Sequence, residues 1–147
     1  MSFDTRNGTR GARQPRGRLL QLANRLTMGR IRRKEGDLLT LVTVGRRSGA
    51  ERRSPVRWFP AGSGGWLIVA SAGGAAGNPA WYYNLGANPA AVRVETSAGM
   101  TAVTAEQLRG DERVAAWGAI IKAAPRFAEY QEKTDRQLPV IRLTPRG

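Results

Sequence analysis

Short apolar runs bounded by turn-forming residues follow one another along most of the chain. Runs of this kind, rich in Val, Ile, Leu, Thr and aromatic residues, are typical of β-strands. The pattern predicts six strands, over residues 38–44, 53–59, 66–71, 91–95, 100–105 and 138–143. Because tight turns join neighbouring runs, we expect an antiparallel sheet rather than a doubly wound parallel one.

Segments with apolar residues at helical spacing precede or separate these strands. It predicts helices over residues 18–35, between Pro79 and Asn88, from residue 110 or 111 to about 123, and from Pro125 through Gln131. Proline favours the first turn of a helix and breaks a helix interior, which places several of these ends. Six short strands with peripheral helices predict a mainly β, α+β fold whose sheet closes into a small barrel, fully or in part.

The chain divides into three parts by composition. Residues 1–17 are rich in Arg, Gly and small polar residues, lack apolar periodicity, and are predicted to be a disordered basic tail. Residues 18–35 are predicted to be a basic amphipathic helix, which either packs on the domain or lies on an anionic membrane surface. Residues 36–147 are predicted to form the folded domain.

The residues that are missing limit the chemistry. The chain has 147 residues, enough for one domain, and contains neither cysteine nor histidine. Disulfides, thiol nucleophiles, zinc sites built on Cys or His, and triads that need His are therefore excluded. No metal site is expected, since the 11 acidic residues would have to supply every ligand. Catalysis must use hydroxyls, carboxylates, Lys, Arg, backbone amides or a bound cofactor.

An excess of basic residues gives the chain a net charge of +13, and ten of the 24 basic residues lie within residues 1–36. Such a chain favours nucleic acid, an anionic membrane face or phosphorylated small molecules. Nucleic acid is the weakest of these, because no helix-turn-helix, zinc-finger or RNP-type motif is present. No secretory signal or membrane span is recognisable, so we expect a cytoplasmic protein. Contact of residues 18–35 with the inner membrane face stays open.

The turn at residues 45–49, with the sequence GRRSG, combines two guanidiniums, a hydroxyl and flexible backbone amides. These groups can cradle an anion. Arg53 and Arg57 on the next strand share one face, and Arg52 points to the other. The alternative is a solvated, charged hairpin tip, and the turn alone does not decide between the two.

Ser71-Ala72-Gly73-Gly74 ends a predicted strand and leads into the Pro79 helix. The glycines allow a ligand to approach the backbone closely, and the amides at the helix start offer a second anion site. Trp81 and Tyr82 either flank a flat ring or pack in the core. On the late helix, Tyr130 beside Phe127 is either a hydroxyl donor to a substrate or a structural tyrosine.

Four runs carry a more specific signal: GRRSGAERRSPV, WLIVASAGG, NPAWYYNLGANP and YQEKTDRQLPVIRL. In this order they resemble the deazaflavin (F420)-dependent nitroreductase family, whose members are split β-barrel reductases found chiefly in actinobacteria. The resemblance covers roughly residues 36–145. It implies a six-stranded antiparallel split β-barrel that binds coenzyme F420.

The resemblance also implies a set of cofactor-binding residues. The family holds the phosphate and glutamyl tail of its cofactor with the glycine-bounded basic turn, and it lines the cofactor site with the next strand, the serine-glycine loop and the aromatic helix. On this chain those segments supply Arg46, Arg47, Ser48, Gly49, Arg52, Arg53, Ser54, Pro55, Val56, Arg57, Ala70, Ser71, Ala72, Gly73, Gly74, Ala80, Trp81, Tyr82, Tyr83, Asn84 and Phe127. Tyr130 and Ser71 are the expected catalytic residues.

Two positions depart from the family pattern. Ala72 stands where the family loop often carries a lysine, and Arg53 or Arg57 is expected to replace that contact with the tail. The family's nitroreductase member has a tyrosine cluster in the late helix, whereas the matching positions here are Ala124, Phe127 and Tyr130. The loss of two hydroxyls argues against nitroimidazole-type substrates and leaves cofactor binding untouched.

The resemblance therefore implies hydride transfer from reduced F420 to a small hydrophobic electrophile such as a quinone, an enone or a nitro compound. Tyr130 would orient the substrate or relay a proton, and Ser71 would hydrogen-bond the cofactor or the acceptor. Two alternatives keep the fold: an FMN-binding protein, and a carrier that binds F420 without catalysis. The sequence leaves the oligomeric state open.

Overall fold

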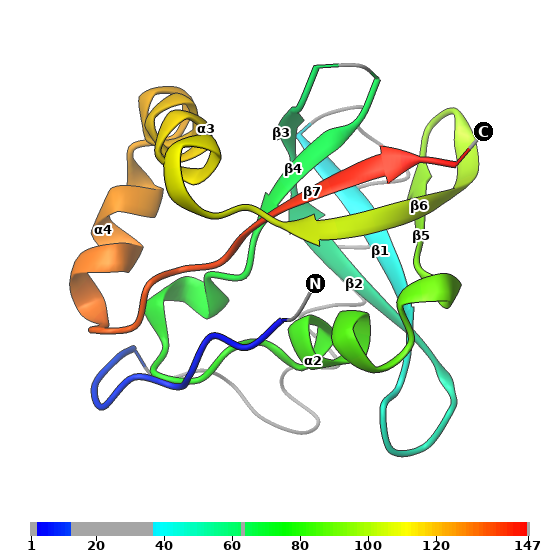
Figure 1. Ribbon diagram of the computed structural model, residues 1–147, viewed down its shortest axis with the longest axis horizontal. Coiled ribbons are helices and arrows are strands. Elements are labelled where there is room, and N and C mark those ends of the chain that lie inside the picture. Colours follow the sequence, from blue (N-terminus) through cyan, green and yellow to red (C-terminus); the bar gives the residue numbers. More distant parts are fainter. Residues whose placement is uncertain (1–2, 13–36, 63, 147) are drawn as a thin grey trace.

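Seven strands form one antiparallel sheet in the order β2-β1-β5-β6-β7-β4-β3. The strands are β1 (Leu38–Val44), β2 (Glu51–Arg57), β3 (Phe59–Pro60), β4 (Trp66–Val69), β5 (Arg93–Thr96), β6 (Gly99–Gln107) and β7 (Val140–Pro145). The computed structural model describes residues 3–12, 37–62 and 64–146. The sheet curls into a half-barrel (Figure 1), which confirms the predicted mainly β fold.

Two apolar clusters fill the inside of the half-barrel and the space under its helices. β1 is buried over five consecutive residues because it pairs with β2 on one side and with β5 on the other. Leu39 and Leu41 of β1 meet Val94, Val103 and Ile141 inside the half-barrel. A second apolar cluster lies between β3, β4 and β7 and two helices, with Phe59, Leu67 and Ile120 among its members.

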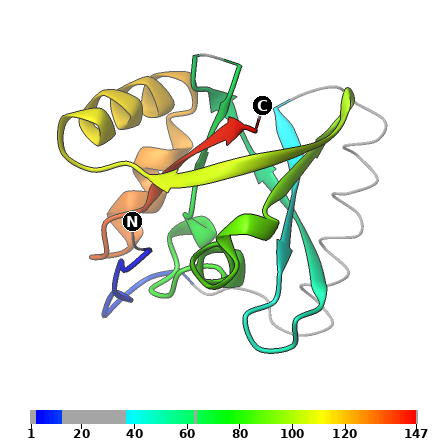
Figure 2. The ribbon, with the colours of Figure 1, turned by 45° about the vertical axis from the view of Figure 1, so that its right-hand side comes forward.

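Three α-helices and two short 3-10 turns connect the strands: α2 (Ala80–Ala87), α3 (Gly110–Ala123), α4 (Arg126–Lys133), η1 (Ala72–Gly74) and η2 (Pro89–Ala91). Pro79 precedes α2, and Pro125 separates α3 from α4, as the sequence predicts. Acidic Asp111 and Glu112 begin α3, which suits the helix dipole. α3 and α4 lie on one side of the half-barrel, and α2 crosses one end of it (Figures 1 and 2).

The sheet has seven strands rather than six because the predicted strand at 53–59 is two strands. β2 ends at Arg57 and pairs with β1, whereas β3 begins at Phe59 and pairs with β4. Trp58 alone lies between them, and its backbone N–H donates to the carbonyl oxygen of Asp37 (2.8 Å). One residue therefore carries the chain from one edge strand of the sheet to the other.

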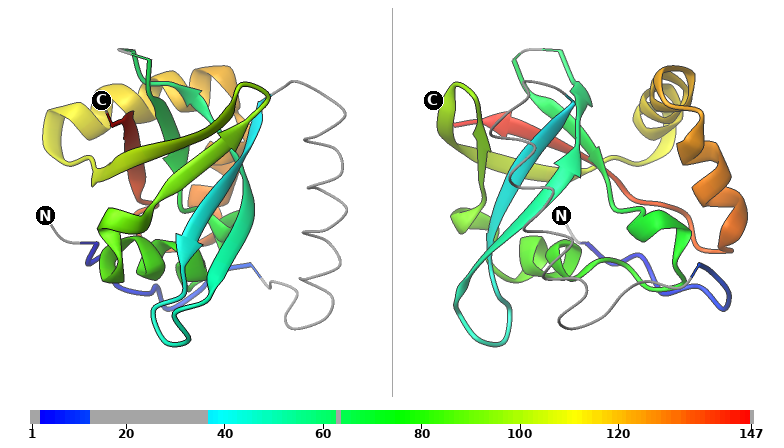
Figure 3. Two further views of the ribbon diagram at one scale, coloured as in Figure 1. Left: turned by 90° about the vertical axis from the view of Figure 1, so that its right-hand side faces the viewer. Right: turned by 180° about the vertical axis from the view of Figure 1, so that it is seen from behind.

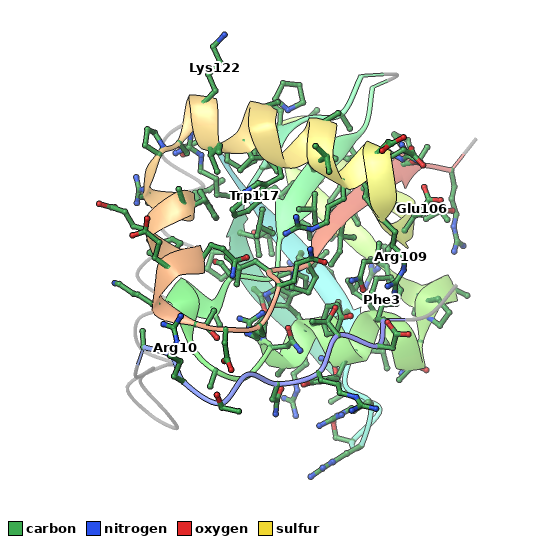
Figure 4. The ribbon with its side chains drawn as sticks, turned by 60° about the vertical axis from the view of Figure 1, so that its left-hand side comes forward. Phe3, Arg10, Glu106, Arg109, Trp117 and Lys122 are labelled. Atoms are coloured by element: carbon green, nitrogen blue, oxygen red, sulfur yellow. The ribbon has the colours of Figure 1, made fainter. Side chains whose placement is uncertain are left out.

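Residues 3–12 form an extended N-terminal strap along the domain, in contrast to the disorder predicted for residues 1–17. The N–H of Thr5 donates to the hydroxyl of Tyr82 (3.0 Å), and the N–H of Gly8 donates to the carbonyl oxygen of Ala76 (2.7 Å). The strap has no apolar periodicity because hydrogen bonds, rather than a buried face, hold it. Phe3 and Arg10 mark its two ends in Figure 4, beside α2 and beside α4.

The helix predicted over residues 18–35 lies outside the described residues, so its packing and its membrane contact stay predictions. Among the described helices, none has the length and apolar character needed to cross a bilayer.

The strap is fastened at Asp135, which supplies a pH test. The side chain and the backbone N–H of Thr9 donate to its carboxylate at 2.5 and 2.7 Å, and these bonds lower the pKa of Asp135 to about 2. Because the folded-state pKa is below that of the unfolded chain, this contribution to stability is present above about pH 4 and is lost as the pH falls through about 2.

We therefore expect Asp135→Asn to lower the urea unfolding midpoint at pH 7. The difference from the wild type should shrink steadily between about pH 4 and about pH 2. Asp111→Asn, at the start of α3, is the matched control without a strap contact. A difference for Asp135→Asn that stays constant over this range would contradict the assignment.

Candidate functional site

A cavity of about 1130 Å³ lies between β2, the segment after β4, the start of α2, and α4. β2 contributes Ser54 to Arg57, the segment after β4 contributes residues 71–79 with the exception of Gly74, and α2 contributes Ala80 and Trp81. α4 contributes Arg126, Phe127 and Tyr130. These elements are seen from behind in Figure 3, right. Ala12, at the end of the N-terminal strap, also lines the cavity.

Part of the cavity wall is apolar. Pro55, Val56, Val69, Trp81 and Phe127 line it. The Phe127 ring is held edge-to-face against Phe59 (ring centres 5.6 Å apart) and Tyr130 (5.4 Å). Trp81 is only 9% exposed, so it packs against the core and lines the cavity at the same time. This wall suits a planar ring.

Arg57 is the main charged group in the wall. Its Nη1 is 3.0 Å from Oδ2 of Asp37, which also lines the cavity. Its Nε is buried and has no hydrogen-bond partner in the part of the chain that the structure describes. A buried N–H without an acceptor is costly, so this atom is a natural donor to a bound ligand.

The segment Ser71–Gly74 turns sharply beside the cavity. Ala72, Gly73 and Gly74 all have positive φ, of 46°, 63° and 86°. The N–H of Gly74 donates to the carbonyl oxygen of Ser71 (2.8 Å), whereas the N–H groups of Ala72 and Gly73 donate to no residue that the structure describes. Backbone amides that converge after such a turn form a small anion-binding concavity.

The basic turn at residues 45–49 joins β1 to β2 and projects from the end of the sheet (Figure 2). The guanidinium of Arg46 lies 4.5 Å from the ring centre of Tyr83, and its backbone N–H donates to Oδ1 of Asn84 (3.1 Å). Nδ2 of Asn84 donates in turn to Oγ1 of Thr43 (3.3 Å). Tyr83 and Asn84 therefore support the basic turn from α2 and do not line the cavity.

The rest of the basic turn is exposed. Oγ of Ser48 accepts from the N–H of Ala50 (3.1 Å) and from Nη2 of Arg52 (3.3 Å). Arg46 and Arg47 have no carboxylate partner within the described residues. β2 runs from this turn directly to Ser54 and Arg57 in the cavity wall, so one strand joins a basic surface to an apolar cavity.

Arg53 does not line the cavity. It pairs with Glu51 on its own strand and with Glu95 on β5, at 3.4 Å each. Of the two arginines expected to replace the missing lysine at Ala72, only Arg57 reaches the cavity.

The structure divides the predicted site residues into three groups. The cavity is lined by Ser54, Pro55, Val56, Arg57, Ser71, Ala72, Gly73, Ala80, Trp81, Phe127 and Tyr130. The basic turn and its support hold Arg46, Arg47, Ser48, Gly49, Arg52, Tyr83 and Asn84. Ala70, Gly74, Arg53 and Tyr82 lie outside both groups.

Tyr82 differs most from its predicted role. It is fully buried, and its hydroxyl donates to Oε1 of Gln107 (2.5 Å) and accepts from the N–H of Thr5. It therefore packs the core and does not flank a bound ring, because it leaves α2 about 100° around the helix from Trp81.

Several wall residues were not predicted: Asp37, Leu38, Val69, residues 75–79 and Arg126. Val69, Asn78 and Pro79 lie within the motif runs but were not assigned to the site, and the others belong to no motif and reach the cavity only through the fold. Within the described part of the chain, no group of three or more acidic side chains is placed to hold a metal ion.

A family model described as F420H(2)-dependent quinone reductase matches residues 18–145. The chain belongs to this family. A relative named F420H(2)-dependent quinone reductase, from Mycobacterium tuberculosis, is 34% identical over 111 residues, which cover 74% of this chain and 73% of the relative.

Solved structures agree with the family in fold. One described as an F420-H2 dependent reductase, FDR-A, is 37% identical with a TM-score of 0.65, over 73% of this chain and 93% of that one. Another, described as a domain-swapped dimer, is 30% identical with a TM-score of 0.67, over 86% and 99%. HutZ, a heme storage protein from Vibrio cholerae, is 15% identical over 84% and 91% with a TM-score of 0.53, and it shares the fold alone.

Asn84 couples α2 to the basic turn, and its removal tests that coupling. Asn84→Ala deletes the acceptor for the Arg46 N–H and the donor to Thr43, both at a site where Asn84 is buried. We expect a loss of about 1–3 kcal/mol in the free energy of unfolding, measured by urea denaturation.

The control is Ser48→Ala, which removes an exposed hydroxyl from the same turn. It should cost less than Asn84→Ala. Equal stability of the Asn84→Ala and wild-type proteins would show that the turn does not depend on α2.

Proposed function

We propose that this chain binds reduced coenzyme F420 and reduces a quinone-type acceptor. The observation that carries the proposal is the continuity of the site: β2 joins a cluster of exposed arginines to a cavity with an apolar wall. A cofactor with a planar ring and an anionic tail needs both features. The family and the M. tuberculosis relative support this assignment.

The residues present fit such a cofactor. The cavity is as large as sites that bury a whole cofactor-sized ligand. Nε of Arg57 and the backbone amides of Ala72 and Gly73 have no hydrogen-bond partner among the described residues, and they offer donors to ring oxygens or nitrogens. Arg46, Arg47 and Arg52 offer guanidiniums to phosphate and carboxylate groups of the tail, for which their planar geometry is suited.

When bound, the reduced deazaflavin supplies a hydride. The chain itself supplies position and a dry environment. Trp81 and Val56 hold a ring against the apolar wall and exclude water from it. Tyr130 and Ser71 place hydroxyls at the cavity, where they hydrogen-bond an acceptor oxygen and help to deliver a proton to it.

The late helix favours a quinone or an enone over a nitro compound. Ala124 is buried in the second apolar cluster, and Phe127 presents a ring without a hydroxyl. The cavity wall at Phe127 is therefore apolar. Among the described residues that line the cavity, Tyr130 supplies the tyrosine hydroxyl. Small apolar acceptors with one or two carbonyl oxygens suit this wall.

FMN and catalytically silent binding of F420 are the competing assignments. Both use the same cavity, but FMN has one phosphate and no glutamyl tail. The arginines of the basic turn should therefore contribute more to F420 affinity than to FMN affinity. Fluorescence titrations with both cofactors distinguish an FMN-binding protein from one that binds F420. Turnover with a quinone distinguishes a reductase from a protein that binds F420 without catalysis.

Arg47→Ala tests the role of the basic turn. We expect about tenfold weaker binding of F420, equivalent to one lost charge-assisted contact, and a smaller salt dependence of the affinity. FMN binding should change much less. Arg142→Ala removes the same charge from the far side of the sheet, where Arg142 pairs with Glu106 and Glu112, and should leave F420 affinity in place. Unchanged F420 binding by Arg47→Ala would refute the tail site.

Tyr130→Phe tests the acceptor side. Loss of the hydroxyl should lower kcat for quinone reduction about 100-fold if it assists proton delivery, with the Kd for F420 nearly unchanged. Tyr82→Phe is the matched control, since its hydroxyl lies in the core. A kcat equal to that of the wild type would remove Tyr130 from the mechanism.

A further inference from the structure

Arg136 is a buried arginine that the proposed chemistry does not use. It is 4% exposed and lies in the corner after α4, which is formed by Thr134, Asp135 and Arg136. Its guanidinium donates four hydrogen bonds: Nε to the carbonyl oxygen of Ala75 (2.9 Å), Nη1 to the carbonyl oxygen of Ala70 (3.0 Å) and to Oδ1 of Asn78 (2.8 Å), and Nη2 to the carbonyl oxygen of Ser71 (2.8 Å). All four acceptors belong to one segment, residues 70–78, which forms much of the cavity wall.

The guanidinium of Arg136 is buried, and each of its hydrogen-bond acceptors is a neutral group. Three are backbone carbonyls and the fourth is a side-chain amide. Burial lowers the pKa of Arg136 from its ordinary value, since water is withdrawn from the guanidinium, yet an arginine stays protonated. A buried cation is stable only when its N–H groups are satisfied, so the carbonyls must stay where they are.

The bonded carbonyls flank the strained part of this segment. Ala70 and Ser71 precede the three residues with positive φ, and Ala75 follows them. Ala72 is a non-glycine residue in that region, at φ 46°, where an L-residue with a side chain is disfavoured. The guanidinium thus ties both ends of a turn that would relax if it were free.

The turn also packs tightly on α4. A Cβ on Gly74 would lie 2.6 Å from the carbonyl oxygen of Tyr130 and 3.0 Å from Cβ of Lys133. The turn therefore lies directly against the backbone of Tyr130, whose side chain also lines the cavity. A shift of the turn changes the cavity itself.

Further hydrogen bonds hold the backbone of the corner that carries Arg136. Nε2 of Gln131 donates to the carbonyl oxygen of Arg136 (2.7 Å), and Oε1 of Gln131 accepts from the N–H of Leu138 (2.9 Å). The N–H of Arg136 donates to Oγ1 of Thr134 (3.3 Å). Asp135 holds the N-terminal strap. The three residues of the corner therefore hold the cavity wall and the strap together.

We propose that Arg136 is a positioning residue: it fixes the turn at residues 70–75 so that Ser71 and the backbone amides of Ala72 and Gly73 face the ligand in the cavity. The identity of that ligand rests on the proposed function, but the effect on the turn does not. Arg136 touches neither cofactor nor acceptor in this scheme and acts through the turn alone.

Arg136→Lys tests the proposal with two readouts on the full chain. Lysine keeps the charge but cannot reach four acceptors at once. The ¹H–¹⁵N resonances of Ala72, Gly73 and Gly74 should shift or broaden, whereas those of β1 and β5 stay in place. For quinone reduction with reduced F420, kcat/KM should fall about tenfold or more, because small displacements of a site are costly. Arg113→Lys is the matched control.

Arg113 is a partly buried arginine that donates to the carbonyl oxygen of Leu138 (2.8 Å) and does not line the cavity. At a comparable loss of Tm, Arg113→Lys should keep kcat/KM within about threefold of the wild type. The proposal would be overturned if the turn resonances of Arg136→Lys stayed at their wild-type positions. It would also be overturned if these resonances moved while kcat/KM stayed at the wild-type value. A wild-type protein without quinone reductase activity would refute the proposed function alone, since the resonances still report on the turn.

A measurement on the wild type covers the case in which Arg136→Lys does not fold. Hydrogen exchange at the N–H groups of Gly74 and Ala75, which bond within the turn at 2.8 and 3.1 Å, should be protected to the level of neighbouring β4. Exchange at the rate of an exposed loop would show that nothing holds the turn, and would overturn the proposal.

Discussion

The passage from β2 to β3 through Trp58 is the constraint on which the rest of the structure depends. β2 and β3 are the two edge strands of the sheet, and one residue joins them. Consecutive Cα atoms are about 3.8 Å apart, so the two edges must meet there and the sheet must curl. Arg57 lies at this seam, paired with Asp37 and stacked 5.0 Å from the ring centre of Phe59. Asp37 and Arg57 also line the cavity, which therefore lies beside this passage.

The other parts of the site are held to the seam by polar contacts between segments far apart in sequence. Arg136 fixes the turn after β4, Asn84 fixes the basic turn, and Asp135 fixes the N-terminal strap. These contacts bring an apolar wall, hydrogen-bond donors without a partner among the described residues, and a basic surface onto one path along β2. Apolar packing alone would build the half-barrel, but it would not set the shape of the turns that line it.

The sequence predicts the regular elements well and their long-range contacts poorly. The strand at 38–44 and the helix at 110–123 match β1 and α3, because local apolar periodicity and turn residues determine them. The break at Trp58 is invisible in a continuous strand pattern, since strand pairing creates it. The order of the strap comes from acceptors such as Asp135, more than 120 residues away. Motifs identified Trp81 and Tyr82 together, and only the fold shows that Trp81 faces the cavity.

The central claim is that one ligand occupies the cavity and the basic turn at once. It is tested most directly by ¹H–¹⁵N spectra of the protein titrated with F420, with Gly73 reporting on the cavity and Gly49 on the basic turn. The account predicts that both resonances move and saturate with the same Kd. Movement of Gly49 without Gly73 would mean that the arginines attract the anionic tail while the cavity stays out of use, and the account would be wrong.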